Sequence, residues 1–225
     1  MYTQLIYKCF GKAFKTGHII LVMRLTTGSK DLDKFLGGYR NSITCIYGPA
    51  ATGKTTMCLL AALEQAKYKK KILFLDTEQG FSVERAKQLC PEFKERLNHI
   101  FVLNPKTFKQ QEEQTLKISK NFDLIIIDTI GSLYRLEIKK DKDKANDSLY
   151  KQLKHLIELK IPIIITNQVY SNFENNIKVI GGKMVEKFSY YLIKLGKNPR
   201  KIMVEKPVKK ESLFDIKEEG VSFKC

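Results

Sequence analysis

The segment Gly48-Pro-Ala-Ala-Thr-Gly-Lys-Thr55 constrains this chain more than any other feature. It follows an apolar run, Ile43–Tyr47, and precedes a segment with helical spacing that begins at Lys54. In such a setting, glycines let backbone N–H groups turn toward a phosphate, a lysine reaches the outer phosphate oxygens, and a hydroxyl holds Mg²⁺. The segment therefore predicts a phosphate-binding loop between a strand and a helix, formed by Gly48, Pro49, Ala50, Ala51, Thr52, Gly53, Lys54, Thr55 and Thr56.

Four further apolar runs have the length and composition of buried strands. They are Ile72–Asp76, Ile100–Leu103, Leu124–Asp128 and 161–166. Continuous apolar runs suit strands that are covered on both faces, so a parallel sheet is expected. Helical spacing fills the intervals 54–68, Val83–Leu89, 109–119 and 147–159. This alternation predicts a doubly wound α/β fold whose ligands bind at the carboxyl ends of the strands.

The C-terminal part has a different pattern, with shorter strands at 190–195, 201–205 and 213–216 between Lys, Gly, Asn and Pro turns. It is predicted to extend the same sheet in antiparallel fashion. The length of 225 residues suits one domain, expected over 23–225. Residues 1–22 are expected to be an extension that reflects a misassigned start codon or a disordered tail, with Phe10-Gly-Lys-Ala13 as an alternative docking motif.

Three polar groups are predicted to meet the phosphate loop at the ends of strands. Asp128 ends a buried strand, as expected of the carboxylate that orders a magnesium shell with Thr55. Glu78 follows the strand Ile72–Asp76 and is a candidate for orienting an attacking water, or else a solvated turn carboxylate. Gln168 can hydrogen-bond a γ-phosphate, or else satisfy the loop backbone.

Composition favours a protein with a polyanionic partner and argues against membrane proteins and proteins with a further metal site. The net charge of +16 would attract a polyanion such as nucleic acid, although the Lys excess also fits an AT-rich genome or a thermophile. The five cysteines form no CxxC pair, which favours a reducing cytoplasm. The three histidines are isolated, so no metal site is expected beyond the nucleotide's own Mg²⁺. No apolar run reaches the ~20 residues of a membrane helix, so no membrane partner is expected.

Taken together, these residues resemble the RecA/RadA recombinase superfamily, and most closely the archaeal RadB proteins, which are short RadA paralogues without the helical N-terminal domain. The resemblance spans about 25–221. It is carried by Thr26-Thr-Gly-Ser-Lys-Asp-Leu-Asp33 with Leu36-Gly-Gly38, by Asp76-Thr-Glu-Gln-Gly-Phe-Ser-Val-Glu-Arg85, by Thr166-Asn-Gln-Val169 and by Gly181-Gly182.

The resemblance implies a RecA-like P-loop NTPase core that binds ATP and Mg²⁺ between neighbouring subunits, and hence a possible homo-oligomer. It implies that Lys54, Glu78 and Gln168 are catalytic and that Arg85 lies near the adenine. Pro207 is either a cap on the neighbour's nucleotide or a turn proline. The resemblance also implies DNA binding by two loops, 132–146 and 170–180, the first with the cations Arg135, Lys139, Lys140, Lys142 and Lys144.

The expected function is an ATP-binding and DNA-binding protein of homologous recombination and repair, acting on single-stranded or branched DNA with weak ATP hydrolysis. Independent strand exchange is not expected, because the second loop is short and sets Glu174 against Lys178. The alternative is a regulatory module that uses ATP as a structural ligand and acts through a RadA-type recombinase or a structure-specific nuclease. A clock-type ATPase lacks support because no paired Glu follows the loop, and a small-molecule kinase because Arg is scarce.

Overall fold

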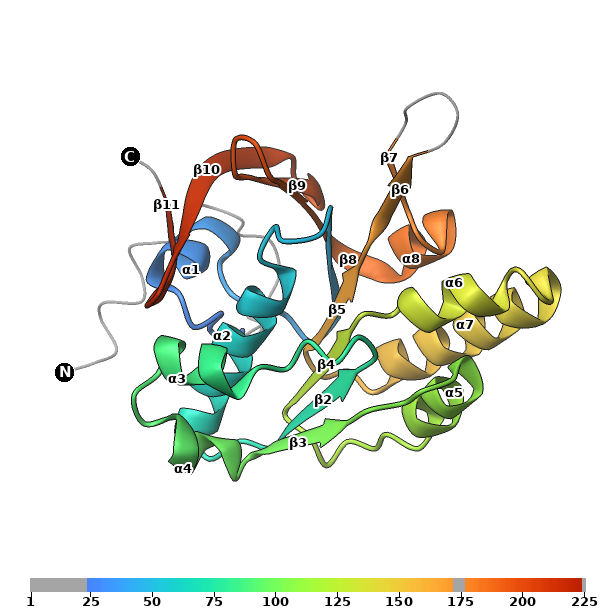
Figure 1. Cartoon of the computed structure of the whole chain (residues 1–225), viewed down its shortest axis with the longest axis horizontal. Coiled ribbons are helices and arrows are strands. Elements are labelled where there is room, and N and C mark those ends of the chain that lie inside the picture. Colours follow the sequence, from blue (N-terminus) through green and yellow to red (C-terminus); the bar gives the residue numbers. More distant parts are fainter. Residues whose placement is uncertain (1–23, 172–176, 224–225) are drawn as a thin grey trace, which may run out of the picture.

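The fold is that of a computed structural model, which describes residues 24–171 and 177–223. Phe10, Ala13 and Glu174 lie outside the described residues. Figure 1 shows a sheet crossed by helices, with the C-terminal strands at one end. The helices are α1 Lys30–Leu36, α2 Lys54–Lys67, α3 Val83–Leu89, α4 Phe93–Leu97, α5 Phe108–Leu116, α6 Ser132–Glu137, α7 Lys142–Glu158 and α8 Gly182–Phe188.

The main sheet has nine strands in the order β11-β10-β9-β8-β1-β5-β4-β2-β3. Strands β1, β2, β3, β4, β5 and β8 pair in parallel, and antiparallel pairing begins between β8 and β9. This arrangement confirms the predicted α/β sheet with antiparallel C-terminal strands. The strands are β1 Ile43–Tyr47, β2 Ile72–Asp76, β3 Ile100–Leu103, β4 Leu124–Asp128, β5 Ile163–Asn167, β8 Ser189–Gly196, β9 Lys201–Lys206, β10 Lys210–Lys217 and β11 Gly220–Phe223.

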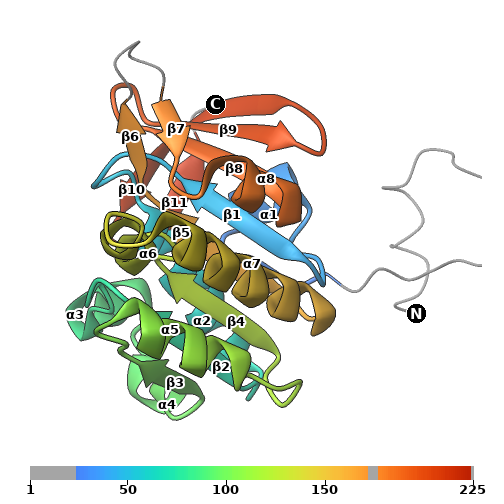
Figure 2. The same ribbon diagram turned by 90° about the vertical axis from the view of Figure 1, so that its right-hand side faces the viewer.

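Helices cover both faces of the sheet, as the doubly wound prediction requires (Figure 2). One hydrophobic core includes residues of α1, α2, α3 and α4, and the other includes residues of α5, α6, α7 and α8. The central strands β1, β2, β4 and β5 are buried throughout because both faces are covered. Among the described residues, no helix is long and apolar enough to cross a membrane.

The prediction that Ile100–Leu103 is a buried strand is wrong in its burial. The strand forms, but only Ile100 is buried, and Phe101 and its two successors are exposed. β3 lies at the edge of the sheet and pairs with β2 alone. An apolar run does not distinguish an edge strand from a central one, because the position in the sheet is set by chain topology.

The prediction of a loop over 132–146 is also wrong. Residues 132–137 form α6, and α7 begins at Lys142. Asp141 is the N-cap of α7, and its side chain accepts a hydrogen bond from the backbone N–H of Lys144. The buried side of α7 begins at Ala145 and continues with Leu149, at helical spacing. The alternating Lys and Asp residues concealed this start signal.

The second predicted loop, 170–180, carries strands at both ends. β6 Val169–Ser171 and β7 Ile177–Val179 pair in antiparallel fashion as a separate two-stranded sheet. The short apolar stretches on both sides of the intervening residues are consistent with a hairpin. Both ends of the predicted loop therefore belong to a two-stranded β-ribbon that projects beyond the main sheet (Figure 1).

Candidate nucleotide-binding site

The phosphate-binding loop connects β1 to α2 and has the backbone that its glycines suggest. Gly53 is the N-cap of α2 with a φ of 100°, in the region that favours glycine. A Cβ atom at Gly53 would also collide with Cδ1 of Ile216. The N-terminus of a fourteen-residue helix thus faces the loop and favours an anion there.

Lys54 lies at the first position of α2 and is 8% exposed. Its ammonium group donates hydrogen bonds to the carbonyl oxygens of Gly48 at 2.9 Å and Pro49 at 2.8 Å. Burial lowers the pKa of Lys54, whereas the carboxylates of Asp128 and Glu78 favour its charged form. The structure thus holds a cation inside the loop, where phosphate oxygens would replace two backbone carbonyls.

Asp128 and Thr55 form a corner suited to Mg²⁺. The Thr55 hydroxyl donates to Oδ2 of Asp128 at 2.6 Å, and the Thr166 hydroxyl donates to Oδ1. Burial raises the pKa of Asp128, while the hydrogen bonds from Thr166 and Thr55 lower it. Within 24–171 and 177–223, no group of three or more His, Cys, Asp or Glu side chains could hold a metal ion. A hydroxyl and one carboxylate fit Mg²⁺ that takes its other ligands from phosphates and water.

Glu78 projects from a loop that Asp76 holds in place. The Asp76 carboxylate is buried and accepts backbone N–H groups from Glu78 at 3.3 Å, Gly80 at 3.0 Å and Phe81 at 2.9 Å. The Glu78 carboxylate accepts a hydrogen bond from Nε2 of Gln168 at 2.7 Å. Side chains that follow β2 and β5 therefore meet across the end of β4, beside the phosphate loop, as expected for parallel strands whose carboxyl ends share one sheet edge.

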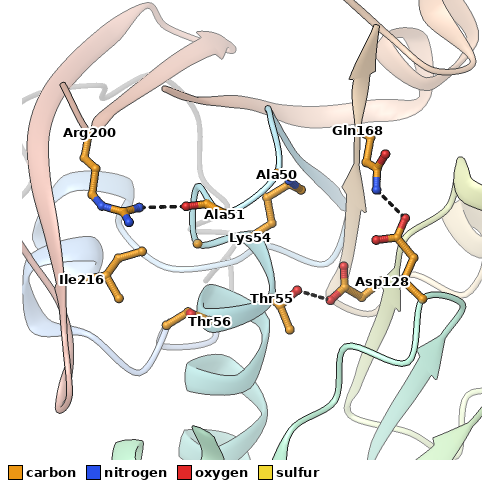
Figure 3. Close-up of a pocket in the computed structure, with 11 residues that line it drawn as sticks. Ala50, Ala51, Lys54, Thr55, Thr56, Asp128, Gln168, Arg200 and Ile216 are labelled. Carbon is orange, nitrogen blue, oxygen red and sulfur yellow. Dashed lines mark hydrogen bonds between the residues drawn. The ribbon is translucent and has the colours of Figure 1, made fainter. Parts of the chain in front are cut away.

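These groups line one open cavity of about 380 Å³. Figure 3 shows Lys54 and Thr55 between Gln168 on one side and Arg200 on the other. Nine of the lining residues were predicted from the sequence, and the cavity has room for a nucleotide's phosphates beside them. These nine are Ala50, Ala51, Gly53, Lys54, Thr55, Thr56, Glu78, Asp128 and Gln168.

Arg200 and Ile216 also line the cavity, and sequence analysis missed both. Arg200 precedes β9, and its Nη1 donates to the carbonyl oxygen of Ala51 at 3.2 Å. Ile216 belongs to β10 and packs where a side chain at Gly53 would lie. No local motif marks either residue, because they reach the loop only through the order of the C-terminal strands.

Arg85 lies outside the residues that line the cavity. Its guanidinium donates to the carbonyl oxygens of Lys217 at 2.7 Å and Glu218 at 3.3 Å, and to Oε1 of Gln88. In this structure Arg85 therefore connects α3 to the turn between β10 and β11. The predicted adenine contact stays a prediction.

The predicted DNA-binding cations lie on α6, on α7 and on the turn between them. All five are exposed, but Lys140 pairs with Glu137 at 3.2 Å. Asp141 and Asp143 also lie among them, so the surface is mixed in charge. The cations of this basic segment are Arg135, Lys139, Lys140, Lys142 and Lys144.

Substituting Arg200 with Met is expected to weaken ATP binding. A guanidinium has five N–H donors, and one of them satisfies Ala51, so others can reach a ligand in the cavity. Loss of one hydrogen bond to a charged group predicts an affinity about tenfold lower. Titration calorimetry with a non-hydrolysable ATP analogue measures this change.

Lys197→Met is the matched control, because Lys197 is an exposed cation of the same turn that does not line the cavity. Equal affinities for the two variants would contradict the role of Arg200.

Comparisons with known proteins identify the family and the fold of this chain. The family model described as Rad51 matches residues 19–223. A protein of Methanococcus maripaludis named "DNA repair and recombination protein RadB" is 39% identical over 189 residues, which cover 78% of this chain and 87% of that protein. A protein of the same name from Methanosphaera stadtmanae is 36% identical over 186 residues, with coverages of 76% and 80%. A solved structure described as "Crystal structure of the RadB recombinase" has a TM-score of 0.72 and 29% identity, and the match covers 88% of this chain and 98% of that one.

Proposed function

This chain belongs to the Rad51 family, and we propose that it is an ATP-binding and DNA-binding protein of homologous recombination and DNA repair that hydrolyses ATP slowly. The relatives named DNA repair and recombination protein RadB support the biological role. One observation supports the chemistry. One cavity at the carboxyl edge of the sheet is lined by all the side chains that this chemistry requires. They are Lys54, the hydrogen-bonded pair Thr55 and Asp128, and the hydrogen-bonded pair Glu78 and Gln168.

In the proposed reaction, a water molecule attacks the γ-phosphorus, and the bond to the β–γ bridging oxygen breaks. The products are ADP and inorganic phosphate, and the proton that the water loses passes to solvent. Lys54 neutralises charge on the β- and γ-phosphate oxygens, and Glu78 accepts a hydrogen bond from the attacking water. Thr55 and Asp128 would hold Mg²⁺, which supplies further charge neutralisation when bound. Because Glu78 is exposed, water screens its interactions, which supports slow rather than fast hydrolysis.

The proposed DNA contact is the basic segment of α6 and α7, with single-stranded or branched DNA as its partner. The five exposed cations favour a phosphate backbone, and α7 begins within this segment. The acids Glu137, Asp141 and Asp143 weaken the positive field of this segment, which supports modest affinity for DNA. The short second loop, 170–180, is the sequence feature that argues against independent strand exchange.

Replacing Lys142 and Lys144 together with Ala tests the DNA contact. Each lost phosphate contact on single-stranded DNA should reduce the slope of log affinity against log salt by ~0.7, so a total loss of about 1.4 is expected. Fluorescence anisotropy with labelled oligodeoxythymidylate across a salt series measures the slope. The control replaces Lys117, the C-cap of α5, and Lys120, which follows it. Both lysines are exposed and lie away from the basic segment.

A wild-type salt slope near zero would contradict DNA binding through this segment. ATP turnover is measured in the same series with and without the oligonucleotide. Turnover that DNA leaves unchanged, together with co-purification of a recombinase or nuclease, would favour the alternative role as a regulatory module. Undetectable ATP binding would refute the nucleotide site itself.

A further inference from the structure

We propose that Thr129 is a positioning residue that connects the Glu78 carboxylate to α6, so that a ligand on α6 and α7 changes the rate of ATP hydrolysis. The inference rests on the proposed function, since it assumes that Glu78 acts on ATP. Thr129 follows Asp128 at the end of β4 and is 1% exposed. It carries no motif by which sequence analysis would single it out.

The Thr129 hydroxyl makes two hydrogen bonds in opposite directions. It donates to Oε1 of Glu78 at 3.2 Å. It accepts the backbone N–H of Ser132, the first residue of α6, also at 3.2 Å. One oxygen atom thus lies between the candidate water-orienting carboxylate and the helix that leads to the basic segment.

The backbone around this hydroxyl is held on several sides. The Thr77 hydroxyl accepts the N–H of Thr129 at 2.9 Å and donates to its carbonyl oxygen at 2.8 Å. The N–H of Ile130 donates to the carbonyl oxygen of Thr166 at 3.1 Å, and the side chain of Gln111 donates to the carbonyl oxygen of Ile130 at 3.2 Å. Because the turn is fixed in this way, the hydroxyl can hold Glu78 in a defined orientation.

Both hydrogen bonds that the Glu78 side chain accepts within the described residues reach Oε1. One donor is Gln168, the candidate group for sensing a γ-phosphate. If the Gln168 amide turns toward a bound phosphate, it leaves Glu78, and Thr129 remains as the group that holds the carboxylate. The Thr129 contact therefore matters most in the state that hydrolyses ATP.

The start of α6 also packs against the end of β5. A Cβ atom at Gly131 would collide with Oδ1 of Asn167 and lie 2.9 Å from Cγ2 of Ile180. The same Asn167 oxygen accepts the N–H of Gln168 at 2.9 Å. A displacement of α6 would thus reach Glu78 by the short route through Thr129 and by a longer one through Asn167 and Gln168.

Thr129→Val tests the inference because it keeps the shape of the side chain and removes the hydroxyl. We expect turnover at saturating ATP to fall about tenfold, because Thr129→Val removes one hydrogen bond to the charged Glu78 carboxylate. KM should change less than about threefold, because this hydrogen bond orients the carboxylate for hydrolysis and does not bind ATP. Thr129→Ser keeps the hydroxyl and should restore turnover to near the wild-type rate. Thr115→Val is the matched control, because Thr115 is buried and its hydroxyl has no partner within the described residues.

Coupling is read from the ratio of turnover with oligodeoxythymidylate to turnover without it. This ratio should approach one in Thr129→Val and stay at the wild-type value in Thr129→Ser and Thr115→Val. In a Glu78→Gln background, Thr129→Val should cause no further loss, because Thr129 acts through Glu78. Additive losses, or an unchanged ratio in Thr129→Val, would overturn the inference.

Amide hydrogen exchange over 76–81 reports on the loop that carries Glu78 and requires no ATP turnover. It therefore tests the role of Thr129 separately from the proposed ATPase activity. Oligodeoxythymidylate should change the exchange of these amides in the ATP-bound wild type and leave it unchanged in ATP-bound Thr129→Val. If the wild type binds ATP without turnover, slow hydrolysis is refuted, and exchange alone decides the role of Thr129. A wild type whose exchange over 76–81 does not respond to the oligonucleotide overturns the inference.

Discussion

Lys54→Met is expected to lower ATP affinity by at least about a hundredfold and to reduce turnover below detection, because charge-assisted hydrogen bonds to phosphate contribute about 1.5–3 kcal/mol each. The Lys54 ammonium already donates to two carbonyl oxygens inside the loop, so a cation is positioned before ATP arrives. Methionine matches the length of the side chain and removes the charge. Titration calorimetry with a non-hydrolysable ATP analogue gives the affinity, and phosphate release gives turnover.

Lys67→Met is the matched control for Lys54→Met. Lys67 lies in the last turn of the same helix and is exposed, with its ammonium group over the ring of Tyr68. Its substitution should leave ATP affinity and turnover unchanged. Near-wild-type ATP affinity in Lys54→Met would mean that the phosphates do not occupy this loop.

The phosphate-binding loop could be predicted from the sequence because its features depend on residues that are adjacent in the chain. Backbone conformation at Gly53, the position of Lys54 at the helix start and the hydroxyl of Thr55 all follow from eight consecutive residues. The strand ends that bring Asp128 and Glu78 to the cavity could also be predicted, because the carboxyl ends of parallel strands share one sheet edge. Short-range patterns are enough for this half of the site.

The other side of the cavity could not be predicted, since it depends on strand order. Arg200 lies 149 residues after Ala51 and directly precedes β9, and Ile216 belongs to β10. Both strands are added to the sheet beyond β8. The sequence indicates that these strands exist but not which side of the sheet they extend. The edge position of β3 escaped prediction for the same reason, so its apolar residues were expected to be buried.

The error over 132–146 has a different cause. The loop over 132–146 is what the family resemblance implies, and its charged residues give no obvious helical pattern, although Asp141 caps a helix and Ala145 begins its buried side. Charge alone does not exclude a helix, because an amphipathic helix has one charged face. The correction matters for function, since cations on helices hold fixed positions relative to Thr129 and Glu78.

Glu78→Gln is expected to reduce ATP turnover by a factor of about 10²–10⁴, the usual contribution of a group that accepts a proton or orients water. ATP affinity should change by less than about threefold, because the amide keeps the shape and the hydrogen bond from Gln168 while removing the charge. Single-turnover phosphate release and analogue binding separate the two effects.

The matched control is Glu84→Gln, since Glu84 is exposed on α3 and does not line the cavity. Its turnover should equal that of the wild type. Equal turnover in Glu78→Gln and wild type would assign Glu78 to the turn alone, where Asp76 already holds the backbone by three N–H groups. A loss of turnover with intact binding instead requires the carboxylate charge, and Glu78 lies exposed beside Asp128 and Lys54, where an attacking water can reach it.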